Sequence, residues 1–515
     1  VPHDWAIYGP FSSLNDKQEV AISQDGQKEA MEHAGRTGGL PFVGVGWYRT
    51  EFDVPQFQAG KRATILFDGA MSHANVYING QKVGYWPYGY NSFHFDITKY
   101  LKPGEKNTLA VRLENLPESS RWYPGAGLYR NVHLIITEDA YIPVWGTYIT
   151  TPSVNEKFAK VNVRTKVVLP EGADPAKYSV ETSVWNPNKQ KLTAVRTSLA
   201  QMKYNNNQAE QEFVIQAPSL WSPEMPALYS AETRLYEGDK LKDIYTTPFG
   251  IRSIEIIPDK GFFLNGKRTV FKGVCNHHDL GPLGAAVNDA AIRRQIRILK
   301  DMGCNAIRTS HNMPAPELIR ACDEMGMMIM AESFDEWNVA KCKNGYNLLF
   351  DEWAEKDLVN LLHNFRNNPS VVMWCIGNEV PNQWNEGDCK IAKWLQDICH
   401  REDPTRPVTQ GMDAPDAVVN NNFAAVMDVA GFNYRPFKYK INYKKLPQRI
   451  VLGSETASTV SSRGVYKFPV ERKAMAKYDD HQASSYDVEH CGWSNLPEDD
   501  FIQHEDLPYC IGEFV

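Results

Sequence analysis

This sequence lacks features that would point to several common classes of protein. No segment approaches the ~18 to 20 continuous apolar residues that a membrane-spanning helix needs. No long run of Lys or Arg occurs, and 55 basic against 62 acidic side chains give a formal charge of −7. This mildly acidic balance argues against nucleic acid or an anionic membrane as a partner.

Cysteine is absent from the first half of the chain. The nine cysteines all lie at or after Cys275, scattered through predicted strands and helices. An odd number with this distribution predicts buried thiols rather than a disulfide framework. The thiols do not indicate the cellular compartment of the protein.

The length of 515 residues predicts two to four domains, each large enough to bury a core. The chain opens on Val1-Pro2-His3-Asp4-Trp5, which is neither a signal peptide nor a Met start. We therefore expect that residues upstream of Val1 are missing.

The first half of the chain is predicted to be all-β. Residues 46–54 largely alternate apolar with polar side chains, and Asn79-Gly80 between the runs 75–78 and 81–83 predicts a tight hairpin. A second β region covers residues 139–252. Its length and short, turn-punctuated strands are typical of an immunoglobulin-like sandwich.

Residues 253–515 alternate short apolar runs with amphipathic segments, the pattern of parallel strands joined by helices. One helix is expected to end at Gly303. Eight strands with intervening helices are what a (β/α)8 barrel needs. The predicted strands span 270–274, 305–308, 327–331, 371–376, 407–410, 428–432, 449–453 and 509–515. We expect a TIM barrel that is truncated at its eighth strand and lacks the last helix.

Two glutamates follow predicted barrel strands, Glu379 after the fourth and Glu455 after the seventh. Chemistry in these barrels takes place at the carboxyl ends of the strands, so the two side chains can converge. Paired carboxylates suit glycoside cleavage, in which one protonates the leaving oxygen while the other attacks or activates water. The alternative is that each glutamate only favours the N-terminus of the following helix electrostatically.

Seven motifs resemble those of glycoside hydrolase family 2, and they occur in the order of that family along essentially the whole chain. They lie at residues 2–5, 120–130, 220–223, 271–278, 308–311, 376–379 and 452–455. The resemblance implies a multidomain β plus α/β protein. Its domains would be a sugar-binding jelly-roll β-sandwich over 1–138, an immunoglobulin-like β-sandwich over 139–252 and a catalytic TIM barrel over 253–515.

The resemblance also implies a retaining exo-β-glycosidase with Glu379 as acid/base and Glu455 as nucleophile. Asn378 is expected to hydrogen-bond the sugar 2-hydroxyl, and Tyr434 to orient Glu455. Three further side chains are expected to line the sugar pocket or to hold the carboxylates: His277, Arg308 and His311. Glu379 must be protonated when attack begins, so its surroundings and the charge of Glu455 are expected to raise its pKa.

The substrate choices within the family are chiefly β-galactosides, β-glucuronides and β-mannosides. The long loop 456–466 resembles that of bacterial β-galactosidases and favours a terminal β-galactoside. The expected partner is an oligosaccharide or glycan, and the sequence is compatible with a homo-oligomer. A non-catalytic carbohydrate-binding protein of the same fold is the alternative from another class, and the presence of both carboxylates argues against it.

Several residues near the predicted strand ends have two interpretations. Asp335 and Glu336 either bind sugar hydroxyls or belong to a solvated loop, and Asp335 is the better candidate. The aromatic, glycine-punctuated loop 119–130 is either a packed turn or a loop that reaches the sugar site. Three tryptophans either stack on sugar rings or pack in the protein: Trp337, Trp384 and Trp493.

No metal or other cofactor is expected to be required. Some family members place a magnesium ion beside the acid/base through a Glu-x-His segment after the third strand, whereas this chain has Glu336-Trp337-Asn338. The rival hypothesis is a metal-dependent barrel hydrolase that uses His277, His278 and Asp279. Consecutive strand residues point to opposite faces, so the two histidines would not readily share a metal. No His-x-x-x-His or Cys-x-x-Cys pattern supports such a site.

Overall fold

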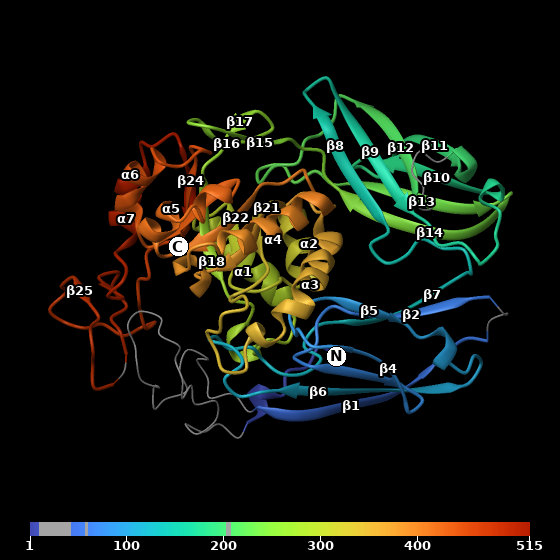
Figure 1. Ribbon diagram of the computed structural model, residues 1–515, viewed down its shortest axis with the longest axis horizontal. Helices are drawn as coiled ribbons and strands as arrows, with labels where there is room; N and C mark the ends of the chain where they lie inside the picture. Colours follow the sequence, from blue (N-terminus) through green and yellow to red (C-terminus); the bar gives the residue numbers. More distant parts are fainter. Residues whose placement is uncertain (10–42, 57–59, 202–207, 481) are drawn as a thin grey trace.

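The computed structural model describes residues 1–9, 43–56, 60–201, 208–480 and 482–515. Two β-sandwiches and a closed barrel follow one another along the chain, and both sandwiches lie on the same side of the barrel in the view of Figure 1. The predicted fold class is therefore confirmed. Residues 10–42 and 57–59 of the predicted first domain lie outside the described residues.

The first sandwich packs a sheet of order β1-β6-β3-β4 against a sheet of order β5-β2-β7. Its strands are β1 (Gly44–Asp53), β2 (Arg62–Phe67), β3 (Ala74–Ile78), β4 (Gln81–Trp86), β5 (Phe93–Asp96), β6 (Lys106–Asn115) and β7 (Val132–Thr137). Alternate residues of β2 and β3 are buried, because successive side chains of a strand point to opposite faces. The predicted hairpin is confirmed: Asn79-Gly80 joins β3 to β4, and Ile78 pairs with Gln81.

The second sandwich packs a sheet of order β11-β10-β13-β14 against a sheet of order β12-β9-β8. Its strands are β8 (Thr147–Val154), β9 (Phe158–Lys166), β10 (Tyr178–Trp185), β11 (Lys191–Ser198), β12 (Gln208–Gln216), β13 (Tyr229–Glu237) and β14 (Lys240–Phe249). Trp221 lies in the connection between β12 and β13. Its fully buried indole donates to the carbonyl oxygen of Asp323 at 2.9 Å, which ties this sandwich to the barrel.

In the described part of residues 253–515, eight parallel strands close into the predicted barrel. They are β18 (Phe271–Asn276), β19 (Ala306–Thr309), β20 (Met328–Glu332), β21 (Val371–Asn378), β22 (Val408–Met412), β23 (Val429–Asn433), β24 (Val451–Glu455) and β27 (Cys510–Phe514). Pairing of β27 with both β18 and β24 completes the closure. Every residue of β20 and β21 is buried, as expected for strands covered on both faces.

Helices cover the outside of the barrel strands. They are α1 (Asp289–Asp301), α2 (Pro316–Met325), α3 (Phe350–Phe365), α4 (Cys389–Glu402), α5 (Pro415–Asn420), α6 (Tyr439–Tyr443) and α7 (Pro497–His504). The predicted stop of α1 is confirmed, because Met302 is its C-cap and Gly303 follows with a φ of +98°. Only glycine adopts such a φ without strain.

Two small sheets flank the barrel. The first precedes it and contains β15 (Ile254–Ile257), β16 (Gly261–Leu264) and β17 (Lys267–Arg268). The second pairs β25 (Lys473–Ala474) with β26 (Glu489–His490) in the long excursion between β24 and β27. The β25 segment projects away from the barrel at the lower left of Figure 1.

Buried polar contacts fasten the first sandwich to the barrel. The Trp86 indole and the Asn91 amide both donate to Oδ1 of Asp357 on α3, at 2.9 and 2.7 Å. The guanidinium of Arg130 donates to the carbonyl oxygen of Met313 at 2.8 Å. Because buried polar groups need partners, these contacts fix how the sandwich sits on the barrel.

None of the helices in the described residues combines the length and apolarity needed to cross a membrane. As predicted, no cysteine of the described residues forms a disulfide bond. Five are buried, whereas four are only partly buried: Cys275, Cys304, Cys389 and Cys491.

Candidate active site

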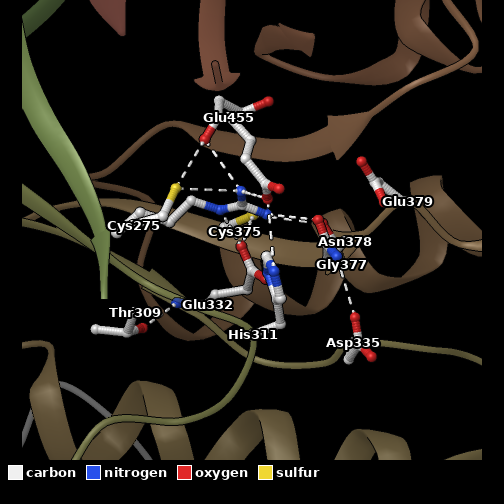
Figure 2. Close-up of polar contacts among 12 residues, drawn as sticks. Cys275, Thr309, His311, Glu332, Asp335, Cys375, Gly377, Asn378, Glu379 and Glu455 are labelled. Atoms are coloured by element: carbon white, nitrogen blue, oxygen red, sulfur yellow. Dashed lines mark hydrogen bonds and ion pairs between the residues drawn. The ribbon is translucent and has the colours of Figure 1, made fainter. Parts of the chain in front are cut away.

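Charged and amide side chains converge where the barrel strands end. Arg308 lies near the end of β19, whereas Glu332, Asn378 and Glu455 are the last residues of β20, β21 and β24. Glu379 follows Asn378 directly. In Figure 2, Glu379 lies beside Asn378, and the Glu455 side chain reaches toward the same cluster from its strand. The convergence expected at one rim of the barrel is therefore present.

Arg308 is the centre of this cluster. Its fully buried guanidinium donates from Nε to Glu332 at 2.5 Å and from Nη1 to Glu455 at 2.8 Å. Nη2 donates to Oδ1 of Asn378 at 2.8 Å. Burial disfavours the guanidinium charge, but the neighbouring carboxylates outweigh it and keep the pKa of Arg308 well above its usual value. Arg308 is thus a fixed cation that links three strand ends.

Glu455 is held by donors on both of its oxygen atoms. Arg308 donates to Oε2, and the Tyr434 hydroxyl donates to Oε1. Nε2 of His311 lies 3.5 Å from Oε2. Burial and then the charge of Glu455 raise the pKa of Tyr434 far above its usual value, so the hydroxyl keeps its proton. A carboxylate oriented by fixed donors is suited to nucleophilic attack.

Glu379 has a different environment. It is partly buried, and its Oε1 accepts a hydrogen bond from Nδ2 of Asn433 at 3.0 Å. Burial first, and the charge of Glu455 second, raise the pKa of Glu379 above its ordinary value, as expected from the sequence. A raised pKa favours the protonated carboxyl, which a general acid requires.

The first domain also contributes to this rim. Nδ2 of Asn378 donates to Oδ1 of Asp335 at 3.0 Å, and Asp335 forms a two-bond ion pair with Arg121 at 2.7 and 2.8 Å. Arg121 belongs to loop 119–130, so that loop reaches the barrel rim rather than being only a packed turn. Burial favours the neutral carboxyl, but Arg121 and Lys341 outweigh it and hold the pKa of Asp335 well below its usual range.

The two predicted pocket histidines lie side by side. The ring centroids of His277 and His311 are 5.4 Å apart, and the Trp122 ring lies 4.6 and 5.9 Å from them. Burial lowers the pKa of His277 to about 4 and that of His311 well below its usual value. Both rings are therefore neutral at pH 7. A neutral imidazole has one donor and one acceptor nitrogen, which suits contact with hydroxyl groups.

Sequence reasoning missed Glu332. This residue is fully buried, pairs with Arg308 and lies 2.8 Å from Nδ1 of His311 through its Oε1. Burial raises the pKa of Glu332 to about 7, although the charge of Arg308 acts to lower it. The prediction that two glutamates follow barrel strands was incomplete, because Glu332 directly follows the predicted strand 327–331 and is the last residue of β20. The rule that selected Glu379 and Glu455 therefore also selects Glu332.

The structure also decides between some of the interpretations that the sequence left open. Trp337 is fully buried and packs against Phe423, so the packing interpretation is confirmed for it. Asp335 and Glu336 are not in a solvated loop, because protein groups bind the carboxylates of both. Two tryptophans are more exposed, Trp384 at 65% and Trp493 at 37%, and their stacking on sugar stays a prediction.

The segment 336–338 does not fit a magnesium site. The Glu336 carboxylate accepts hydrogen bonds from the backbone N–H groups of Lys341, Cys342 and Asn347, and the Trp337 ring lies in the core. Within the described residues, no group of three or more His, Cys, Asp or Glu side chains is placed to hold a metal ion.

The rival metal site built on the paired histidines also lacks support. Nε2 of His278 is directed at the carbonyl oxygen of Pro124 at 3.0 Å, whereas the ring of His277 packs on Trp122. The two imidazoles therefore have different surroundings.

We expect Glu332→Gln to lower the free energy of unfolding by about 3 kcal/mol, because it removes one of the two carboxylates, those of Glu332 and Glu455, that compensate the buried Arg308 charge. Urea denaturation of the intact protein measures this change. Glu355→Gln is the matched control, since Glu355 is 48% exposed and pairs with Arg401 on the surface. It should change the free energy by no more than about 0.5 kcal/mol. Equal effects of the two substitutions would contradict a structural role for the Glu332–Arg308 pair.

Comparison with known proteins defines the class to which this fold and site belong. The glycosyl hydrolases family 2 models match three consecutive parts of the chain: the sugar binding domain over residues 41–138, the family 2 domain over 141–252 and the TIM barrel domain over 255–491. The chain belongs to glycoside hydrolase family 2.

Among its relatives is the β-galactosidase BoGH2A of Bacteroides ovatus, which is 37% identical over 555 residues that cover 100% of this chain and 63% of the relative. A β-glucuronidase of Bacteroides fragilis is 32% identical, with 71% of this chain and 54% of the relative covered. A crystal structure of a β-glycosidase from Bacteroides vulgatus matches with a TM-score of 0.86 and 30% identity, covering 100% of this chain and 65% of that one. The chain thus spans between 54% and 63% of the length of these two curated relatives.

Proposed function

We propose that the intact protein is a retaining exo-β-glycosidase in which Glu455 is the nucleophile and Glu379 the acid/base. The observation that supports this most directly is that the two glutamates share one cluster but have opposite environments. Donors from Arg308 and Tyr434 hold both oxygen atoms of Glu455. Burial and the charge of Glu455 instead raise the pKa of Glu379 and favour its protonated form. A glycosidase needs this division between two carboxyl groups.

The proposed reaction has two steps. Glu455 attacks the anomeric carbon while the bond to the leaving oxygen breaks, and Glu379 transfers its proton to that oxygen. The ester that forms removes the charge of Glu455, so Glu379 is stable as a carboxylate. It then takes a proton from a water molecule whose oxygen attacks the same carbon and displaces Glu455. Two inversions give net retention.

The neighbouring side chains have proposed roles in the same reaction. Asn378, held between Arg308 and Asp335, would donate to the sugar 2-hydroxyl, a contact that strengthens in the transition state. Tyr434 would orient Glu455, and the neutral rings of His277 and His311 would contact sugar hydroxyl groups.

We propose a terminal β-galactoside as the substrate. Loop 456–466 resembles that of bacterial β-galactosidases, and the β-galactosidase relative is similar over the whole of this chain. A β-glucuronide is the second candidate. The β-glucuronidase relative supports it, as do two buried cations at the rim, Arg121 and Lys341, although Asp335 pairs with both. A β-mannoside is the third choice within the family.

We expect 4-nitrophenyl β-D-galactoside to be hydrolysed with a kcat/KM at least about 10-fold above the values for the β-glucuronide and β-mannoside. NMR of the fresh product should show the β-anomer first. A faster glucuronide or mannoside would contradict the galactosidase assignment and leave the glycosidase proposal intact. Sugar binding in calorimetry without hydrolysis of any of the three would instead favour a carbohydrate-binding protein.

A further inference from the structure

Lys341 contacts two neighbours at the barrel rim. One is Asp335, which forms the ion pair with Arg121 of the first domain, and the other is the peptide bond that precedes Glu379. Its side chain is only 4% exposed. Nζ donates to the carbonyl oxygen of Asn378 at 2.7 Å and to Oδ1 of Asp335 at 3.1 Å. Arg121 donates to both carboxylate oxygens of Asp335. The two-step reaction gives this buried ammonium no task of its own.

The peptide between Asn378 and Glu379 is fixed at both of its polar atoms. Its oxygen accepts from Lys341, and its N–H donates to the carbonyl oxygen of Gly411 at 2.7 Å. Glu379 has a φ of +40°, in the left-handed region. For a residue other than glycine this conformation is strained and persists only where surrounding contacts impose it. Lys341 and Gly411 supply such contacts.

Lys341 also acts on the charge of Glu379. Burial and the charge of Glu455 raise the pKa of Glu379, whereas Lys341 and Arg121 lower it. Burial and Arg121 lower the pKa of Lys341 itself, and Asp335 and Glu379 raise it. Tyr434 and Asp413 also interact with Glu379, and burial followed by Glu379 raises the pKa of Asp413 to about 7.

We propose that Lys341 is a positioning residue for Glu379: its ammonium holds the preceding peptide in place and sets a fixed positive charge beside the acid/base. This inference rests on the proposed function. The chain itself supplies a cation at this position, while its segment 336–338 does not fit a magnesium ion. Because Asp335 binds both Lys341 and Arg121, the position of the ammonium also depends on the docking of the first domain.

Lys341→Met in the intact protein tests this role, because methionine has a similar length but neither charge nor donor. With the sugar that the wild type prefers, kcat for a poor alkyl leaving group should fall by about 100-fold, as for a misplaced catalytic group. The loss for 2,4-dinitrophenol as leaving group should stay below about 10-fold, since this group needs little protonation. The basic limb of the kcat/KM profile should move to higher pH, because losing a nearby positive charge disfavours the ionised form of Glu379.

Lys343→Met is the matched control. Lys343 is 61% exposed and lies 3.5 Å from Glu118, so its kinetics and pH profile should match those of the wild type. Lys341→Gln is a second variant that keeps a neutral donor, and its fold is checked by circular dichroism. It should show the shift of the basic limb with a smaller loss of kcat. Equal losses for both leaving groups with an unshifted basic limb would overturn the proposal, because a merely structural role produces that pattern.

The outcome for Lys341 can be separated from the outcome for the proposed function. A wild-type protein without β-glycosidase activity overturns the proposed function and the role of Lys341 with it. If the wild type is active and Glu379→Gln shows the leaving-group pattern of a lost acid while Lys341→Met does not, only the role of Lys341 is wrong.

Discussion

Replacing Glu379 with Gln is expected to reduce hydrolysis of substrates with poor leaving groups by about 100- to 10,000-fold, the usual contribution of a general acid. Glutamine keeps the shape of the side chain and the contact to Asn433 but has no acidic proton. Substrates with 2,4-dinitrophenol need little protonation, so their first step should change by less than about 10-fold. Values of kcat/KM across a series of aryl and alkyl glycosides measure this difference.

The same substitution should change the pH profile. The pKa of Glu379 is raised by burial and by Glu455, so the acid stays protonated below that raised pKa and is lost as the pH rises through it. The kcat/KM of the wild type should therefore fall on the basic side, and the Glu379→Gln variant should lack that limb. Glu386→Gln, at an exposed position seven residues further on, is the matched control. Equal losses on good and poor leaving groups would refute the acid assignment.

Replacing Glu455 with Ala is expected to reduce turnover of every substrate by at least about 1,000-fold, because both steps depend on this carboxylate. The substitution also leaves Arg308 and Tyr434 facing a space without the oxygen atoms that they bind. Steady-state rates with the activated 2,4-dinitrophenyl glycoside measure the loss, since protonation of the leaving group does not limit that reaction. Glu505→Ala, at an exposed position, should keep wild-type rates.

Added azide distinguishes the two glutamates further. In Glu455→Ala, azide would attack the anomeric carbon from the emptied side, and one inversion gives the α-glycosyl azide. In Glu379→Ala, azide would attack the glycosyl-enzyme, and two inversions give the β-glycosyl azide. NMR of the products reads the configuration. A β-glycosyl azide from Glu455→Ala would contradict the nucleophile assignment.

The fold was largely predictable because its elements have strong local signals. Asn79-Gly80 specified the first hairpin, and the buried run before Asn378 marked a strand covered on both faces. Alternating strand and helix patterns in residues 253–515 were sufficient to predict a closed barrel. Strand ends were less certain, since the predicted strand 327–331 ends one residue before β20 does.

The site was predictable only where its residues follow barrel strands. Glu379 and Glu455 lie there, and so does Arg308, whose place at the centre of the cluster follows from burial that the sequence does not reveal. Arg121 belongs to another domain, so its contact with Asp335 depends on how the sandwich docks. Lys341 comes from a loop between β20 and α3, and a lysine in a loop is normally read as a solvent-exposed residue. A residue that reaches the site from another domain, or from a loop, has no periodic sequence pattern that marks it.

The central claim is that one sugar ring is attacked by Glu455 while Glu379 protonates its leaving group. Mass spectrometry of the intact protein after reaction with a 2-deoxy-2-fluoro β-glycoside of the preferred sugar tests it most directly, because the fluorine slows the second step and lets the ester accumulate. The account predicts a single added sugar on the peptide that contains Glu455. A label on Glu379, or labelling that persists in Glu455→Ala, would contradict it.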